Sequence, residues 1–410
     1  MLLNKVWISL FLIAFLTALS KLIFWHDLFI FEKIINSIFE ASKSGFEISL
    51  YFTGALCLWM GIMRIGEEGG AVRIMSRFVS PLFSKLFPEV PKNHPAIGSM
   101  MMNISANMLG LDNAATPMGL KAMKELQALN PKPDTATNAQ IMFLVLNASG
   151  LTIIPISILS LRAANGSASP TEVFLPILIS TFFATLAGLI FVAIRQGINL
   201  FNKVILAYVG SIALVISGLL VLVINRPEFI KPISSVGSNL ALFSIIIGFI
   251  VLAIRSKINV YNAFIEGAKG GFDVAIGIVP FLIAMLAAIA VFRASGALDA
   301  FMDGIKYSLT FIGVVSVEFV DVLPVAFMKP FSGSGARALM VDSWTAFGVD
   351  SFKGKLAATF QGSTETTFYV LAVYFGAVNV RQTRYAAMGG IVCDIVGFSV
   401  AIFVSYLFYS

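Results

Sequence analysis

The sequence predicts an all-α polytopic membrane protein with about nine crossings, and three observations lead to that fold class. The 410 residues are 58% hydrophobic and only 12% charged, whereas about a quarter of the residues in a soluble domain are charged. Many apolar runs reach the roughly 20 residues that a transmembrane helix needs. Two further stretches are interrupted by polar residues before they reach that length. A water-soluble globule is therefore excluded.

The apolar runs give the order of the predicted spans. The first run lacks a small-x-small cleavage site and ends at Lys21, so we interpret it as a retained anchor and not as a signal peptide. The predicted crossings are residues 6–24, 46–63, 138–161, 173–194, 204–224, 236–254, 274–292, 356–378 and 385–408.

The composition also excludes several classes of protein. Two cysteines and two histidines are too few for a disulfide scaffold or a multi-histidine metal site. The sequence has no P-loop lysine motif, GxSxG elbow or HExxH motif. We therefore expect no enzyme activity, no metal and no cofactor. The net charge of +6 in such a chain indicates cytoplasmic loops and anionic lipid headgroups, not nucleic acid.

Residues 96–129 and 307–347 each consist of two arms that are too short to span, and we interpret both as re-entrant helical hairpins. The arm from Tyr307 leads to a polar interruption at residues 329–335. In the first hairpin, Thr116 followed by Pro117 predicts a cap and the start of a half-helix. Since hydrocarbon tolerates broken helices only around protein or a wet cavity, the two hairpins predict one shared cavity.

The two halves of the chain repeat one order of elements: an apolar helix, a broken hairpin, a helix with a polar patch, and a last apolar span. The polar patches are residues 147–152 and 361–367. Counted from the helix at 46–63 itself, five predicted spans, an odd number, precede its counterpart at 274–292. The second copy is therefore expected to be inverted. The larger share of the Lys and Arg residues falls on the amino-terminal side, which predicts a cytoplasmic amino terminus.

Polar side chains at these interruptions are the candidate binding residues, because half-helix ends meet near the midplane in inverted-repeat transporters. In the first half they are Asn103, Asn107, Asp112, Asn113, Thr116, Asn147, Ser149 and Thr152. In the second half they are Lys329, Ser332, Ser334, Arg337, Gln361, Ser363, Thr364, Glu365 and Thr366.

Each candidate has a structural alternative. The asparagines near residue 107 can hydrogen-bond between helices, and Asp112 with Asn113 can form a turn. The patch at 361–367 can be a serine and threonine lattice between packed helices. Glu365 speaks against that, because a carboxylate at mid-depth needs a cation, a proton or a partner. Glu318 is either interfacial or part of an ion path, so Glu318 and Glu365 are the candidates for ion or proton coupling.

Three motifs resemble a known family. Residues 107–123, NMLGLDNAATPMGLKAM, resemble the hallmark of the spore maturation A protein. Residues 329–337, KPFSGSGAR, together with 361–369, QGSTETTFY, resemble the spore maturation B protein. The chain is thus similar to a fusion of the two, with an A-like half at 1–196, a junction at 197–235 and a B-like half at 236–410.

This family carries the nucleoside recognition or gate domain, which is shared with the membrane region of ferrous iron transporter B and related to concentrative nucleoside transporters. The resemblance implies an inverted-repeat, transporter-like fold in the bacterial plasma membrane, with the helix at 204–224 as an adapter. The chain lacks a GTPase domain and a gate cysteine motif, so iron is not the expected cargo. In spore formers the pair is linked to dehydration of the spore core.

Two functions remain open. The first is a transporter or channel for a small polar solute, nucleoside-like or a small anion, coupled to an ion such as H⁺ or Na⁺. The second is a non-transporting membrane scaffold or regulator of envelope or spore maturation. A polar pocket between the interruptions favours the first, and apolar filling favours the second. The expected partners are the bilayer, the solute, the coupling ion and a second copy of the chain.

Overall fold

The computed structural model describes residues 2–91, 93–110, 112–225, 236–314 and 316–409, and its helices confirm the all-α prediction. An isolated bridge between Thr135 and Gln382 is the one β-type pairing within these residues. The first helices are α1 (Leu2–Trp25), α2 (Ile30–Glu68), α3 (Ala71–Leu86), α4 (Pro95–Met108), α5 (Asp112–Ala128), α6 (Asn138–Ala148), α7 (Ile156–Ala164), η1 (Pro170–Val173), α8 (Phe174–Gln196) and α9 (Lys203–Asn225). The others are α11 (Ser238–Arg255), α12 (Val260–Ala294), α13 (Ala297–Phe311), η4 (Glu318–Val322), α14 (Leu323–Met328), α15 (Gly333–Phe347), α16 (Phe352–Ser363), α17 (Thr367–Gly376) and α18 (Ala386–Tyr409).

Six helices in the described ranges are long and apolar enough to cross a membrane, or up to seven if the bent pair α12 and α13 is one span. Large apolar side chains on these helices face outward, such as Leu16 on α1, Leu214 on α9 and Leu240 on α11. These features indicate a multi-pass membrane protein. The count of about nine crossings is not confirmed, because the expected spans at 138–161 and 356–378 are each two short helices separated by a break.

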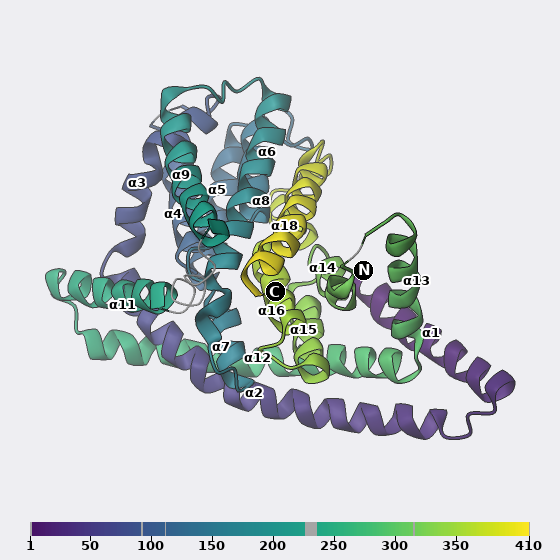
Figure 1. Ribbon diagram of the computed structural model, residues 1–410. Helices are drawn as coiled ribbons and strands as arrows, with labels where there is room; N and C mark the ends of the chain where they lie inside the picture. The colour runs from purple at the N-terminus through teal and green to yellow at the C-terminus, as the bar shows by residue number, and fades with distance from the viewer. Residues whose placement is uncertain (1, 92, 111, 226–235, 315, 410) are drawn as a thin grey trace.

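Helices α2 and α12 form a long antiparallel pair along the base of the molecule in Figure 1. Glycines bring the two backbones together: a Cβ on Gly267 would lie 2.4 Å from the Met60 carbonyl oxygen. Such small residues are typical of helix contacts in membranes, where close packing replaces the hydrophobic effect. The helix that precedes each member of the pair packs mainly on the other member: α1 packs on α12, and α11 packs on α2.

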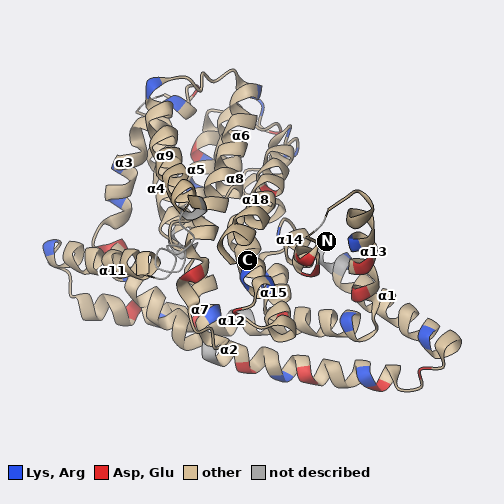
Figure 2. Cartoon of the chain, viewed as in Figure 1, with Lys and Arg blue, Asp and Glu red and all other residues tan. Residues whose placement is uncertain are grey.

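Helix α2 is longer than the span expected at 46–63. Its 39 residues extend over about 58 Å at 1.5 Å per residue, whereas the hydrocarbon core of a bilayer is about 30 Å thick. Charged residues alternate in sign along its first half, as Figure 2 shows. Lys43 and Glu47 there form an exposed pair one turn apart. The first half of α2 therefore carries the polar character of an aqueous or headgroup environment.

Helices α8 and α18 form a second antiparallel pair. A Cβ on Gly188 would lie 2.4 Å from the Cys393 sulfur, and one on Gly397 would lie 3.2 Å from the Cβ of Ala184. Residue numbers therefore increase along α8 in the direction in which they decrease along α18, so the two helices are antiparallel. The glycines let the two helices approach too closely for any larger side chain.

The broken helices α6–α7 and α16–α17 are the third antiparallel pair. The segment before α6 is joined to the segment after α17, where the Ala136 amide donates to the Gln382 carbonyl oxygen at 2.9 Å. The end of α7 is joined to the segment before α16, where Arg162 donates to the Val349 carbonyl oxygen at 2.8 Å. The breaks of the two helices therefore lie at the same level.

Arg162 is the centre of the second of these joints. Its guanidinium is fully buried and pairs with the Asp350 carboxylate at 2.7 Å. It also donates to the Ser167 hydroxyl and to the carbonyl oxygens of Ser169 and Pro170. Burial acts to raise the pKa of Asp350, but hydrogen bonds from Ser167, from the Ala168 amide and from Arg162 outweigh it and hold that pKa below its usual value.

Replacing Arg162 with alanine is expected to destabilise the protein by about 3 kcal/mol or more, because it leaves buried carbonyl oxygens and a carboxylate without their donor. Thermal unfolding of the purified protein in detergent measures the loss. Arg195→Ala is the control, since Arg195 is exposed and surface changes stay within about 0.5 kcal/mol. Equal losses of stability in the two variants would contradict this account.

The same contact makes stability depend on pH. Since the pKa of Asp350 is lower in the folded protein than in the unfolded chain, its contribution to the free energy of unfolding is present above the unfolded pKa and is lost as the pH falls through the folded pKa.

The first predicted hairpin is present, because α4 and α5 pack on each other and the chain turns at Gly110 with a φ of +73°. The half-helix expected to begin at Thr116 and Pro117 is wrong: α5 begins at Asp112, and Pro117 lies inside it. The fold thus keeps the hairpin but moves its second arm.

The second hairpin is shorter than predicted. Tyr307 lies in α13, which ends before Gly313 with a φ of +91°, so the expected arm from Tyr307 is wrong. The arms are η4 with α14 on one side and α15 on the other, and residues 329–332 join them. A glycine in the left-handed conformation commonly ends a helix, as Gly313 does after α13. From composition alone, the end of α13 cannot be distinguished from the start of a hairpin arm.

Candidate functional site

The two helix breaks touch each other through their backbones. The Glu365 amide donates to the Ala148 carbonyl oxygen at 3.0 Å. Gly150, with a φ of +64°, lies directly against this contact, because a Cβ there would be 2.7 Å from the Glu365 nitrogen. The polar patches of the two halves, more than 200 residues apart in the chain, are therefore neighbours.

Each break also touches the tip of a hairpin. The Ile153 amide donates to the Met108 carbonyl oxygen at 2.7 Å, and the Phe368 amide donates to the Pro330 carbonyl oxygen at 2.9 Å. Glycines again allow the approach: a Cβ on Gly110 would lie 2.7 Å from the Ile154 oxygen, and one on Gly333 would lie 2.8 Å from Thr366 Oγ1. Four interruptions of helical backbone thus meet at one place.

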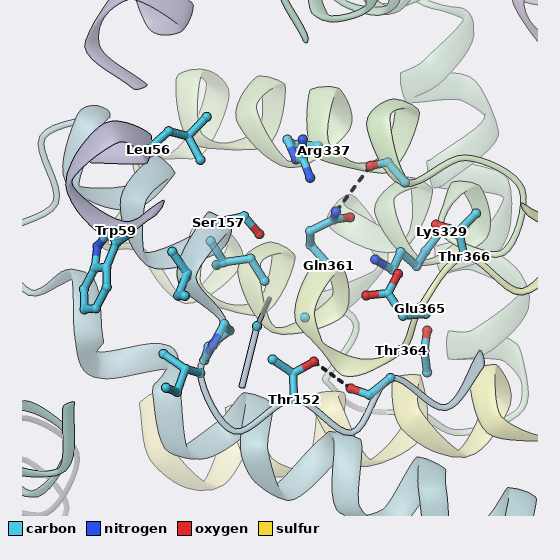
Figure 3. Close-up of a pocket in the computed structure, with 18 of the residues that line it drawn as sticks. Leu56, Trp59, Thr152, Ser157, Lys329, Arg337, Gln361, Thr364, Glu365 and Thr366 are labelled. Atoms are coloured by element: carbon cyan, nitrogen blue, oxygen red, sulfur yellow. Dashed lines mark hydrogen bonds between the residues drawn. The ribbon is translucent and has the colours of Figure 1, made fainter. Parts of the chain in front are cut away.

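A cavity of about 220 Å³ lies where they meet (Figure 3). One wall is apolar and comes from α2, and the other walls come from the breaks, the start of α7 and the second hairpin. The lining residues are Leu56, Trp59, Met60, Met63, Gly110, Gly150, Thr152, Ile154, Pro155, Ile156, Ser157, Ile158, Lys329, Gly333, Arg337, Gln361, Gly362, Thr364, Glu365 and Thr366.

The charge of this lining is positive. Lys329 and Arg337 come from the second hairpin, and Glu365 comes from the second break; the remaining lining residues are neutral. Lys329 is only 5% exposed. Three helices, α7, α15 and α17, also begin at the cavity, and helix amino termini carry partial positive charge. The cavity therefore favours a solute with negative charge or with several hydrogen-bond acceptors.

Gln361 and Thr364 have hydrogen-bonding capacity to spare. The Gln361 amide nitrogen donates to the Gly333 carbonyl oxygen at 3.3 Å, as Figure 3 shows, while its oxygen Oε1 is buried and lacks a partner among the described residues. The buried Thr364 hydroxyl is in the same condition. Buried polar atoms are nearly always hydrogen-bonded in folded proteins, so two unsatisfied atoms on one cavity indicate a place for a polar ligand or water.

Seven predicted site residues line the cavity: Thr152, Lys329, Arg337, Gln361, Thr364, Glu365 and Thr366. Ser332 lies beside it as the cap of α15, where its hydroxyl accepts from the Gly335 amide at 3.0 Å and lies 3.3 Å from the Ser334 hydroxyl. Ser332 is thus the amino-terminal cap of α15. The second-half candidates are largely brought together.

The asparagines form a separate cluster behind the cavity. Asn107 donates to the Asn147 side-chain oxygen at 2.8 Å, and Asn103 donates to the Ala115 carbonyl oxygen at 2.8 Å and to the Tyr374 hydroxyl at 3.2 Å. These bonds join the first hairpin to both broken helices. The alternative of helix-to-helix hydrogen bonding describes this cluster.

The other predicted residues lie apart from the cavity. Ser149 accepts from the Thr185 hydroxyl, and Ser363 donates to a carbonyl oxygen of its own helix. Thr116 is exposed on α5, and Glu318 is exposed at the start of η4. The side chains of Asp112 and Asn113 lie outside the described residues.

The residues of α2 that form the apolar wall of the cavity were not predicted from the sequence. Trp59 and Met63 line the cavity from a helix that the sequence presents as an ordinary apolar span. Asp394, which is not among the predicted site residues, is buried beside the second break. Within the described ranges, no group of three or more His, Cys, Asp and Glu side chains is placed to hold a metal ion.

The comparisons with known proteins agree with this architecture. The sequence profile of the nucleoside recognition (Gate) family matches residues 49–165, which run from α2 through the first hairpin and the first break. Spore maturation protein A of Bacillus subtilis (strain 168) is 34% identical over 187 residues, which are 46% of this chain and 92% of that protein. Spore maturation protein B of the same organism is 41% identical over 172 residues, 42% of this chain and 94% of that protein. The resemblance read from the motifs is confirmed.

Proposed function

Because this chain belongs to the spore maturation protein A and B family, with its nucleoside recognition (gate) domain, we propose that it is a membrane transporter for a small polar solute. The solute binds in the cavity between the hairpin tips and the two helix breaks. One observation carries the proposal: four interruptions of helical backbone meet around a polar cavity. Within a membrane, such interruptions are tolerated only in protein or at a wet cavity, and transporters use them to bind solutes.

The proposed architecture is two inverted repeats. The counterparts α2 and α12, α8 and α18, and the two broken helices are each antiparallel pairs, which is what a two-fold axis in the membrane plane produces. The contacts of α1 with α12 and of α11 with α2 are consistent with the same axis. In this proposal the first repeat is residues 1–196, α9 is the adapter in the junction at 197–235, and the second repeat is residues 236–410.

The proposed orientation places the start of α6 and the end of α17 on the cytoplasmic side of the bacterial plasma membrane. Lys and Arg residues gather at this end of the bundle, which is the top in Figure 2, and cytoplasmic loops are rich in these residues. They include Lys132, Arg195, Lys203, Arg381 and Arg384.

The size and charge of the cavity define the proposed solute. A volume of about 220 Å³ is below the roughly 300–1,000 Å³ of a drug-sized pocket, so the solute is small. The positive lining favours a small anion, and the amide and hydroxyl groups with the Trp59 wall favour a nucleoside-like solute. A scaffold without cargo would be expected to fill this centre with apolar side chains, so the polar lining supports transport over that alternative.

Transport is tested with the purified protein in proteoliposomes. The vesicles are incubated with a metabolite extract, and the accumulated compounds are identified by mass spectrometry. Radiolabelled uridine and inorganic phosphate serve as defined probes of the two solute classes. We expect one class to accumulate above the level in protein-free vesicles. Vesicles that take up nothing from the extract or either probe, with or without H⁺ and Na⁺ gradients, would favour the scaffold function.

A further inference from the structure

Asp394 is a carboxyl group buried in the middle of α18. It is 2% exposed and lies within the candidate span Ala386–Tyr409. Its Oδ2 accepts from the Thr367 hydroxyl at 2.7 Å. Its Oδ1 is buried and has no hydrogen-bond partner in the described part of the chain. An ionised carboxylate buried in this condition is energetically unfavourable.

The second helix break separates this carboxyl from the cavity. Thr364 lines the cavity and also packs on α18, where its methyl carbon would lie 2.8 Å from a Cβ on Gly397. On the other side of Asp394, the Thr367 methyl carbon would lie 2.3 Å from a Cβ on Gly390. The two glycines therefore let the break lie directly on the helix turn that carries Asp394.

The Thr364 hydroxyl faces Asp394. Among the described residues, neither this hydroxyl nor Asp394 Oδ1 has a hydrogen-bond partner within bonding geometry, and both atoms are buried. One proton on Asp394 would give both atoms a hydrogen-bond partner, since a protonated Oδ1 can donate its O–H to the Thr364 hydroxyl oxygen.

The surroundings of Asp394 are otherwise apolar. Gly188 and Ala184 of α8 and Val145 of α6 pack on this part of α18, and the neighbouring Cys393 faces α8. From α16, α17 and the break between them, the facing groups are the hydroxyls of Thr364 and Thr367. Lys329, which lines the cavity beyond the break, is a charged group whose field reaches Asp394.

We infer that Asp394 is the proton-binding residue of this protein and couples solute binding in the cavity to proton movement. The coupling rests on the proposed function, whereas the bound proton does not. When a solute binds to the Thr364 hydroxyl, the O–H bond of Asp394 breaks, and the proton passes by way of Thr364 to water in the cavity. A proton fits this position better than a sodium ion, because Asp394 lines none of the described cavities and a metal ion needs space and several oxygen ligands.

Infrared spectroscopy of the full chain in lipid tests the proton directly, without a solute. A protonated carboxylic acid has a C=O stretching band that is separate from those of carboxylates and amides. We expect this band at neutral pH in the native protein, its loss in Asp394→Asn, and its retention in Glu365→Gln, the control carboxyl that is exposed to the cavity. A band that is missing in the native protein, or unchanged in Asp394→Asn, would overturn the assignment.

A second variant covers the case in which Asp394→Asn fails to fold. Thr364→Val keeps the shape of the side chain and removes the hydroxyl that accepts from Asp394. We expect it to shift the C=O band, because the hydrogen bond to the carboxyl changes. An unshifted band would mean that Asp394 does not donate to Thr364, and the proposed proton path would be wrong.

The coupling is tested with uridine and inorganic phosphate as probes in proteoliposomes that contain a trapped pH indicator dye. We expect a pH gradient to drive accumulation by the native protein. In Asp394→Asn, gradient-driven accumulation should fall at least about tenfold while exchange without a gradient continues. Accumulation that follows a Na⁺ gradient, or equal proton-driven accumulation by the variant, would contradict the coupling. If neither probe moves in the native protein, the proposed function fails for these probes and the infrared result still decides whether Asp394 holds a proton.

Discussion

Replacing Gln361 with alanine is expected to lower solute uptake about tenfold or more while the yield and thermal stability of the protein stay close to those of the native chain. Gln361 is 5% exposed and lines the cavity. The one hydrogen bond that its side chain makes to the described residues, to the Gly333 carbonyl oxygen, is long at 3.3 Å, so its removal has little effect on the fold. Its oxygen Oε1 is unsatisfied within the described residues and is free to bind a donor on the solute. A hydrogen bond of about 1.5 kcal/mol corresponds to a tenfold change in affinity.

Glu365→Ala is expected to have an effect of the same order, because Glu365 is the acidic residue among the described lining residues. Uptake by proteoliposomes, normalised to the amount of inserted protein, measures both variants. Ser343→Ala is the control: its hydroxyl is buried but bonds only within α15, to the Leu339 carbonyl oxygen, and lines no part of the cavity. Unchanged uptake by Gln361→Ala and Glu365→Ala would remove these residues from the site.

The sequence could predict where the helices break, because the signal for a break is local. Residues 147–152 and 361–367 are polar within apolar runs, and both are breaks in the structure. The turn near Gly110 could be predicted for the same reason. Polar patches of this kind are unfavourable in a continuous helix that is surrounded by hydrocarbon. Their composition alone therefore indicates that the helix is interrupted.

The exact limits of the helices depend on longer-range contacts and could not be predicted in the same way. Composition presents Tyr307 as part of a hairpin arm, yet the chain turns at Gly313 and gives it to α13. Composition likewise presents residues 46–63 as one span, yet α2 continues as one helix from Ile30. Apolar residues are consistent with a span, an arm or part of a longer helix, and packing against neighbours decides between them.

The assembly of the cavity was predictable mainly from the second half of the chain. The motifs single out two segments of that half together, and the structure places six of their predicted residues on one cavity: Lys329, Arg337, Gln361, Thr364, Glu365 and Thr366. Trp59 and Met63 give no such signal, because an apolar residue in an apolar helix is expected whether it faces lipid, core or solute. The asparagines predicted polar contacts, and these contacts are between helices: Asn107 bonds to Asn147, and Asn103 bonds to Tyr374.

The contact between the two helix breaks is expected to depend on a single glycine. In Gly150→Ala the new Cβ would lie 2.7 Å from the Glu365 nitrogen and 2.9 Å from the Thr364 carbonyl carbon. These are backbone atoms that cannot rotate away as a flexible side chain can. The breaks must therefore separate, which removes the hydrogen bond from the Glu365 amide to the Ala148 oxygen. Overpacking costs about 1–3 kcal/mol, and the positive φ adds about 1–2 kcal/mol.

Gly166→Ala is the matched control because it separates these two effects. Gly166 has a φ of +76°, close to the +64° of Gly150, but a Cβ there would meet nothing within 4 Å. The control should show only the backbone term, whereas Gly150→Ala should have a distinctly lower apparent Tm in the same detergent and should lose uptake, since two walls of the cavity move apart. Equal Tm values for the two variants would mean that the breaks do not press on each other. In that case the cavity would have to be held together by the hairpin contacts at Gly110 and Gly333 alone, and substitutions there should have the larger effect.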